Sequence, residues 1–242
     1  MDSNKLHILW IGAHPDDEAV VSGTLAKAAK KGHKVAICVI SKSEKGSVTI
    51  PADELVHIRE KEMKKAAEIL GAEYIGNLGE GDHNVFVTIE LIRKIVKMIR
   101  QIRPDIVITH WERDYHLDHI NTGLAVTQAA LSASAPGFKT GQESHYVQRL
   151  YYSDTSNCTD FEPDFWIDIS DTIDIKIQSF QAHKTQLMYL GRRGQDPVER
   201  VELQSRLRGM QSNTKYAEAF RSCRKARFVH AELGNVKSLF HL

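Results

Sequence analysis

Short apolar runs alternate with longer helical segments through the first half of the chain. Four runs rich in isoleucine and valine predict buried strands at residues 6–12, 35–40, 73–77 and 105–110. Helices are predicted at residues 18–31, 53–70, 88–102 and 119–133. Repeated strand–helix units are typical of a mostly parallel sheet with helices on both faces. We therefore expect a Rossmann-like, three-layer α/β/α fold.

The pattern changes beyond about residue 145. Two further strands and a helix are predicted at residues 148–152, 165–169 and 171–183. Residues 190–200 are polar, with two glycines and a proline, and predict a mobile connection. A helix near 199–210 and a strand near 227–230 are expected to follow. No repeat or change in composition divides the chain, so residues 1–242 are expected to form a single domain.

Composition excludes several classes of protein. The formal net charge of +1 gives no overall attraction to nucleic acid or to an anionic membrane. Basic residues in the last third are interspersed with acids and lack aromatic partners for base stacking, so no nucleic-acid partner is expected. Three scattered cysteines (Cys38, Cys158 and Cys223) predict a reducing compartment. With no signal-peptide pattern and no long apolar run, we expect a soluble, cytoplasmic protein.

Polar residues follow each of the first four predicted strands. They occupy residues 13–18, 41–45, 77–83 and 110–119. Because the carboxyl ends of parallel strands meet at one edge of a sheet, these segments are expected to converge on a binding site. No Gly-x-Gly-x-x-Gly sequence follows the first strand, so the site is not a dinucleotide site.

Two of these segments contain residue types that bind metals. The first reads Ala13-His14-Pro15-Asp16-Asp17-Glu18, and the second contains three histidines and three acids between Thr109 and His119. His14 and Asp17 are three residues apart, as are His116 and His119, so each pair can share a face of a turn or helix. A simple helix cap would need one acid and no histidine.

A catalytic zinc ion usually takes three protein ligands and keeps one position open. His14, Asp17 and His119 are the expected ligands. Asp16 would then be the general base, and His116 would supply a proton or stabilise an oxyanion, with Asp118 accepting its other N–H. His110, at the end of a strand, is as readily interpreted as a core histidine bonded to the backbone.

Two other functions fit part of this pattern. Two histidines and a carboxylate also form the facial triad of non-haem iron enzymes, although an oxygenase has no use for a base such as Asp16 beside the metal. A non-catalytic sugar- or metal-binding protein would not need Asp16, His116 and Asp118 together. Zinc is the expected ion, with Fe²⁺ or another divalent metal as the alternative.

The two motifs resemble those of the PIG-L/LmbE-like de-N-acetylases of amino sugars, which include enzymes of the mycothiol and bacillithiol pathways. The likeness rests on residues 13–18 and on His116-Leu117-Asp118-His119, where the family usually has His-Pro-Asp-His. Fainter likeness appears at residues 58–60, 70–71, 104–105, 183–186 and 216–220.

This resemblance implies a zinc-dependent hydrolase that removes the N-acetyl group of an amino sugar or N-acetylglucosaminide and often forms a homo-oligomer. It assigns the same ligands and general base as above, and it implies that Arg59 and Gln186 contact the substrate. Arg59 lies one helical turn from Leu55 and Met63, on a largely apolar face where an arginine needs a partner. Glu62 is an alternative, purely structural partner. Several relatives use a mobile tyrosine, for which Tyr115 and Tyr216 are the candidates in this chain.

Overall fold

The computed structural model describes residues 5–192, 194 and 196–225. A seven-stranded sheet lies at the centre of the fold. Its strands are β1 (His7–Gly12), β2 (Lys34–Ser41), β3 (Glu73–Glu80), β4 (Ile106–Thr109), β5 (Arg149–Ser153), β6 (Phe165–Asp168) and β7 (Ala217–Ser222). They lie in the order β3-β2-β1-β4-β5-β7-β6. The pairs among β1 to β5 are parallel, and β7 runs antiparallel to both β5 and β6. The predicted mostly parallel α/β sheet is confirmed.

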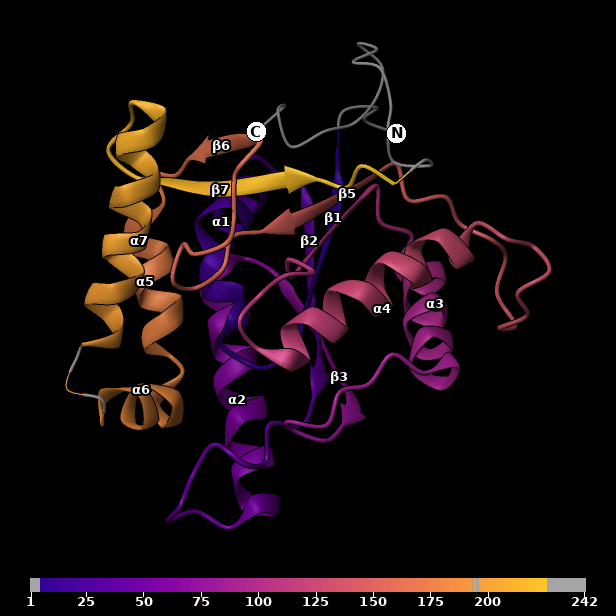
Figure 1. Ribbon diagram of the computed structural model, residues 1–242, viewed down its shortest axis with the longest axis horizontal. Helices are drawn as coiled ribbons and strands as arrows, with labels where there is room; N and C mark the ends of the chain where they lie inside the picture. Colours follow the sequence, from indigo (N-terminus) through magenta and orange to yellow (C-terminus); the bar gives the residue numbers. More distant parts are fainter. Residues whose placement is uncertain (1–4, 193, 195, 226–242) are drawn as a thin grey trace.

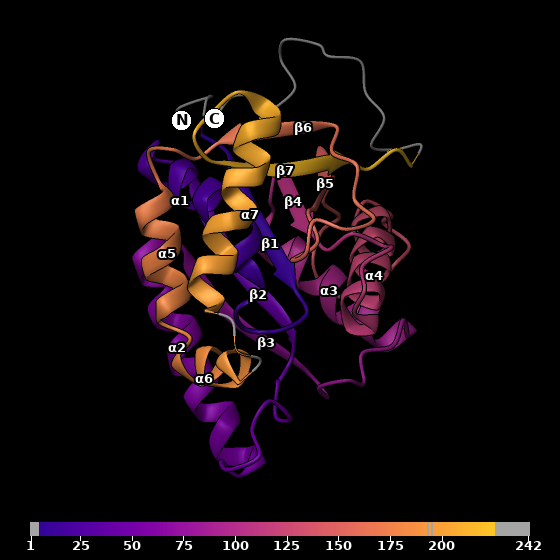
Figure 2. The ribbon, with the colours of Figure 1, turned by 60° about the vertical axis from the view of Figure 1, so that its left-hand side comes forward.

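Helices cover both faces of the sheet (Figures 1 and 2). They are α1 (Ser22–Lys30), α2 (Ala52–Leu70), α3 (Ile89–Ile102), α4 (Leu117–Ala133), α5 (Ile173–Gln181), α6 (Lys184–Gly191) and α7 (Pro197–Ser212). Helices α3 and α4 pack together on one face, whereas α1, α2 and α5 pack on the other. The predicted three-layer arrangement is therefore also present.

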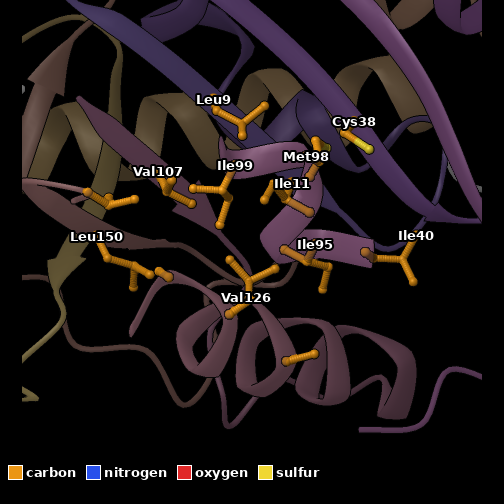
Figure 3. Packing of buried hydrophobic residues seen from close by; sticks show 14 of the residues in the cluster. Leu9, Ile11, Cys38, Ile40, Ile95, Met98, Ile99, Val107, Val126 and Leu150 are labelled. Carbon is orange, nitrogen blue, oxygen red and sulfur yellow. The ribbon is translucent and has the colours of Figure 1, made fainter. Parts of the chain in front are cut away.

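The alternation of side chains along β1 divides the core in two. Leu9 and Ile11 point into the layer of α3 and α4, where Ile95, Ile99 and Val126 meet them (Figure 3). Ile8 and Trp10 point into the opposite layer. Since β1 is apolar on both faces, it lies in the interior of the sheet. Its carboxyl end lies at the edge where the polar segments are expected to converge.

Three predicted segments differ from the structure. The helix expected at 18–31 is interrupted at Val21, because a 3₁₀ turn (Asp17–Val20) precedes α1. Helix α6 lies where no helix was predicted, and α7 begins at Pro197, within the segment interpreted as a connection. Asp196 caps α7 by accepting the Val198 N–H at 2.8 Å, which explains this early start. The strand predicted near 227–230 lies outside the described residues.

None of the described helices is both long enough and apolar enough to span a bilayer.

Candidate active site

A cavity of about 290 Å³ opens at the carboxyl ends of the parallel strands. Its wall includes residues that follow each of β1 to β5 and residues from α5, α6 and α7. The polar and charged strand ends and helix faces of this wall include His14, Asp16, Asp17, Lys45, Arg59, Asp82, Tyr115, His116, His119, Asn157, Gln186, Tyr189 and Arg200, and Gly46 also lines it. The convergence of the polar strand ends on one site is confirmed.

The first motif forms a tight turn between β1 and the 3₁₀ turn. Asp16 has a left-handed backbone (φ 99°), an uncommon conformation for a residue with a side chain. The Asp17 carboxylate accepts the His14 N–H at 2.7 Å, and the Glu18 carboxylate accepts the Asp16 N–H at 3.1 Å. These two hydrogen bonds fix the backbone that presents Asp16 and Asp17 to the cavity.

Three imidazole rings contact the Asp17 carboxylate, and His110 Nε2 lies 3.1 Å from its Oδ2. The same Oδ2 atom is 3.4 Å from His14 Nδ1, and Asp17 Oδ1 is 3.2 Å from His119 Nε2. One ligand atom from each of His14, Asp17 and His119 lies within 4.8 Å of the other two. Burial alone would raise the pKa of Asp17, but the facing histidines, His119 foremost, hold it well below its usual value. Two imidazoles and an ionised carboxylate in this arrangement fit a divalent cation such as zinc.

Two residues support His119 from behind. Its Nδ1 lies 3.2 Å from Asp114 Oδ1, on the ring edge opposite Asp17. His110 stacks on the His119 ring at a centroid distance of 4.1 Å, and His110 Nε2 accepts the buried Ala13 N–H at 3.0 Å. His110 is thus bonded to the backbone, which was one of its two interpretations. Sequence reasoning gave no role to Asp114, although it belongs to the histidine-rich segment.

Asp16 lines the same cavity without belonging to the candidate ligand group. Burial, followed by the nearby charge of Asp17, raises the pKa of Asp16 to about 7. The positive charges of His183 and Arg59 act in the opposite direction. A carboxyl group in this environment can exchange a proton near neutral pH, which suits a general base.

The structure arranges His116 and Asp118 differently from the sequence expectation. His116 caps α4, and its Nδ1 accepts the backbone N–H of Asp118 at 3.2 Å. The Asp118 carboxylate instead lies 3.1 Å from His14 Nε2 and accepts the Val85 N–H at 3.2 Å. Asp118 therefore supports the expected ligand His14, and His116 lines the cavity with its Nε2 atom not used by the cap. Leu117 occupies the first position of α4, where proline is also favoured, so the turn is kept.

Arg59 and Gln186 meet at the cavity wall. Arg59 is buried in α2, and its Nη2 donates to Gln186 Oε1 at 2.5 Å. Glu62, the alternative partner, accepts hydrogen bonds from the N–H (2.9 Å) and hydroxyl (2.6 Å) of Thr185 instead. The two expected substrate-binding residues are therefore neighbours, although they lie 127 positions apart in the chain.

A buried pair behind Asp16 was missed by sequence reasoning. His183 Nε2 lies 2.6 Å from Glu18 Oε1, and both side chains are buried. The other carboxylate oxygen of Glu18 accepts a hydrogen bond from the Asp16 N–H. Both residues fall in the motifs quoted for the family resemblance, but no spacing in the sequence indicates that they touch.

Of the two candidate tyrosines, Tyr115 lines the cavity. The Tyr216 hydroxyl donates to Glu202 at 2.8 Å, and Tyr216 does not contribute to the wall. Tyr189, on α6, is a further tyrosine of the wall.

Several known proteins are similar to this chain in sequence and in fold. A family model described as GlcNAc-PI de-N-acetylase (PIG-L) matches residues 9–130. The diacetylchitobiose deacetylase of Thermococcus kodakarensis is 31% identical over 192 residues, covering 74% of this chain and 69% of that protein. A probable N-acetyl-α-D-glucosaminyl L-malate deacetylase of Bacillus cereus is 28% identical over 189 residues, covering 74% of this chain and 83% of that protein. The crystal structure of the conserved protein TT1542 from Thermus thermophilus superposes with a TM-score of 0.80 and 30% identity, over 93% of this chain and all of that one.

Proposed function

The chain belongs to the PIG-L family of de-N-acetylases, and we propose that it uses one zinc ion to hydrolyse the N-acetyl group of an N-acetylglucosamine conjugate. The products are acetate and the free amine. The observation that carries this proposal is the position of Asp16, which lines the cavity beside His14, Asp17 and His119.

In this proposal His14, Asp17 and His119 hold the metal. A bound zinc ion would polarise the amide carbonyl and lower the pKa of a water molecule in the site. Fe²⁺ is the alternative ion, because the same donor set also suits iron. The contacts of Asp118 with His14 and of Asp114 with His119 would orient the two imidazoles.

The proton transfers are assigned to Asp16 and His116. The Asp16 carboxylate takes a proton from the attacking water, which then bonds to the amide carbon. The His116 Nε2 atom delivers a proton to the departing nitrogen, because its Nδ1 atom already accepts the Asp118 N–H. A proton at Nε2 would also stabilise the negative charge that develops on the carbonyl oxygen. Arg59 and Gln186 would bind the sugar or its aglycone.

Acetate release tests this function. The panel contains a malate conjugate and an inositol conjugate of N-acetylglucosamine, diacetylchitobiose, and free N-acetylglucosamine, each with zinc-loaded wild type and with Asp16→Ala. Release from at least one compound that disappears in the variant supports the proposal. Full activity in Asp16→Ala would show that Asp16 is not the general base. No acetate release from any compound, with metal still bound, would favour a binding protein.

Three further expectations remain predictions. They are a single domain over residues 1–242, a cytoplasmic location and a homo-oligomeric state. The three cysteines form no disulfide bond in the described part of the chain.

A further inference from the structure

Three cations line the cavity together with the histidine cluster. They are Lys45, which follows β2, Arg59 on α2, and Arg200 on α7. The acids that line the same cavity are Asp16, Asp17 and Asp82. Asp17 and Asp82 both contact His14, at 3.4 and 3.3 Å, and Asp16 is their neighbour in the first motif. The negative charges of the wall are thus gathered at the candidate metal site, and the three cations come from three other elements of the wall.

Each of these cations hydrogen-bonds to a neutral oxygen. Lys45 Nζ donates to the main-chain carbonyl of Asp82 at 2.6 Å, and Arg59 Nη2 donates to Gln186 Oε1 at 2.5 Å. Arg200 Nη2 donates to the side-chain carbonyl of Asn157. Within the described residues, no carboxylate oxygen lies within 4 Å of any of the three cationic groups.

Two other buried arginines of this protein have more of their donors paired, and Arg100 donates to five neutral oxygens. Arg208 is also buried and forms two hydrogen bonds with the Asp154 carboxylate, at 2.7 and 2.9 Å. A guanidinium group has five N–H donors, and a single amide oxygen satisfies one of them. Arg59 is buried with no carboxylate of the described residues within 4 Å, and Asp16 acts on its charge only from a greater distance. An anion that contacted Arg59 would therefore gain both Coulomb energy and hydrogen bonds.

We infer that the substrate carries an anionic group, a carboxylate or a phosphate, on the part of the conjugate that lies away from the acetamide. This inference rests on the proposed function, because the candidate metal site fixes which end of the substrate is cleaved. The acetamide would lie at the histidine cluster, and the anion would lie against Lys45, Arg59 and Arg200. A neutral disaccharide would give these three cations no charged hydrogen-bond acceptor.

The test compares kcat/KM for anionic and neutral compounds that share the same sugar. The carboxylate probe is N-acetylglucosaminyl malate, the phosphate probe is N-acetylglucosamine 1-phosphate, and the neutral probes are methyl N-acetylglucosaminide and diacetylchitobiose. We expect wild type to prefer at least one anionic probe by about tenfold, which corresponds to one charge-assisted hydrogen bond. The preference should decrease as sodium chloride is added, because salt screens the attraction.

Variants locate the source of this preference. Arg200→Gln should lower the anionic-to-neutral ratio of kcat/KM by about fivefold, and Lys45→Gln by about threefold because Lys45 is more exposed. Arg206→Gln, on the same helix as Arg200 but outside the cavity wall, and Lys65→Gln on α2 remove the same charge. Both controls should leave the ratio unchanged.

The results separate this inference from the proposed function. A higher kcat/KM for the neutral probes than for the anionic probes would overturn the inference of an anionic substrate. Variants that lower kcat/KM equally for both kinds of probe would also overturn it. In both cases the protein would still be a working deacetylase. A difference between the malate and phosphate probes would identify which anion is recognised. No acetate from any probe would instead contradict the deacetylase proposal itself.

Discussion

The Glu18 carboxylate lies 2.6 Å from His183 Nε2, and neither side chain is exposed to solvent. Through its other oxygen, Glu18 accepts the N–H of Asp16, whose backbone has the uncommon φ of 99°. The pair therefore connects the start of the 3₁₀ turn to the segment between α5 and α6. Since a strained backbone persists only where its surroundings fix it, this pair is part of what orients Asp16.

His183→Gln should weaken both the fold and the reaction. Removing the imidazole leaves a buried carboxylate without its ionic partner, at a cost of about 3 kcal/mol in unfolding free energy. We also expect kcat to fall about tenfold with little change in KM, because Asp16 loses its fixed position. Denaturant unfolding, steady-state kinetics and metal content measure the three quantities, and the metal content should not change.

A second buried ion pair supplies a matched control for His183→Gln. Lys176 Nζ lies 2.6 Å from Glu218 Oε1, and Glu218 accepts N–H groups at the start of α1 rather than in the first motif. Lys176→Met should lower stability to a similar degree without lowering kcat in the remaining folded protein. Equal losses of kcat in both variants would show that His183 acts only through stability.

The stabilising effect of the Glu18–His183 pair should depend on pH in one direction. Burial alone would lower the pKa of His183, but the adjacent Glu18 carboxylate outweighs it and the pKa is raised. The folded state therefore holds this proton more tightly than the unfolded state. The stability difference between wild type and His183→Gln should be largest below about pH 6.5 and should decline as the pH rises through the folded pKa. Unfolding curves between pH 6 and 9 test this, and a difference that grew with pH would contradict it.

Asp16→Asn should abolish most of the activity while keeping the site intact. The amide has nearly the same size and cannot take a proton, and asparagine tolerates the left-handed backbone at this position. We expect kcat to fall by about 10² to 10⁴. Metal content should match that of wild type, and a variant that also lost its metal would identify Asp16 as a ligand instead.

The order of the elements as far as α4 and the cavity residues that follow β1 to β4 could be predicted because each depends on local sequence. Apolar runs in strands that are buried on both faces identify β1 and β4, and polar residues that follow a parallel strand must lie at its carboxyl edge. The grouping of His14, Asp17 and His119 follows from these two rules. It needed no knowledge of how the last third of the chain folds.

Two of the contacts that sequence reasoning missed join segments that are far apart in the chain. The Asp118 carboxylate contacts His14, 104 positions away, and Glu18 contacts His183, 165 positions away. No periodicity or spacing encodes such a contact, because it depends on how helices pack over the sheet. Helix α6 was missed for a related reason, since none of its described residues is buried and it has no apolar stripe to mark it.

Removal of the metal should destabilise the protein as well as inactivate it. The carboxylate of Asp17 and the rings of His14 and His119 would lose the ion that they share, so a chelator should lower the melting temperature. An ion present at a thousand times its Kd stabilises the fold by about 4 kcal/mol. Calorimetry of dialysed and zinc-restored protein measures this, with His119→Ala as the variant that should show no zinc response. A metal-free protein with the same melting temperature and full activity would exclude the proposed metal site.

Gly46→Ala should weaken substrate binding without damaging the fold. A Cβ atom built at Gly46 would overlap the Arg59 guanidinium, so the arginine head must move and its hydrogen bond to Gln186 is disturbed. The backbone strain is small because Gly46 does not have a positive φ. We expect KM to rise about five- to tenfold with kcat nearly unchanged, which is the result of losing binding that ground state and transition state share. Gly137→Ala is the matched control, because nothing lies within 4 Å of a Cβ atom there. A normal KM in Gly46→Ala would mean that the position of Arg59 does not matter to the substrate.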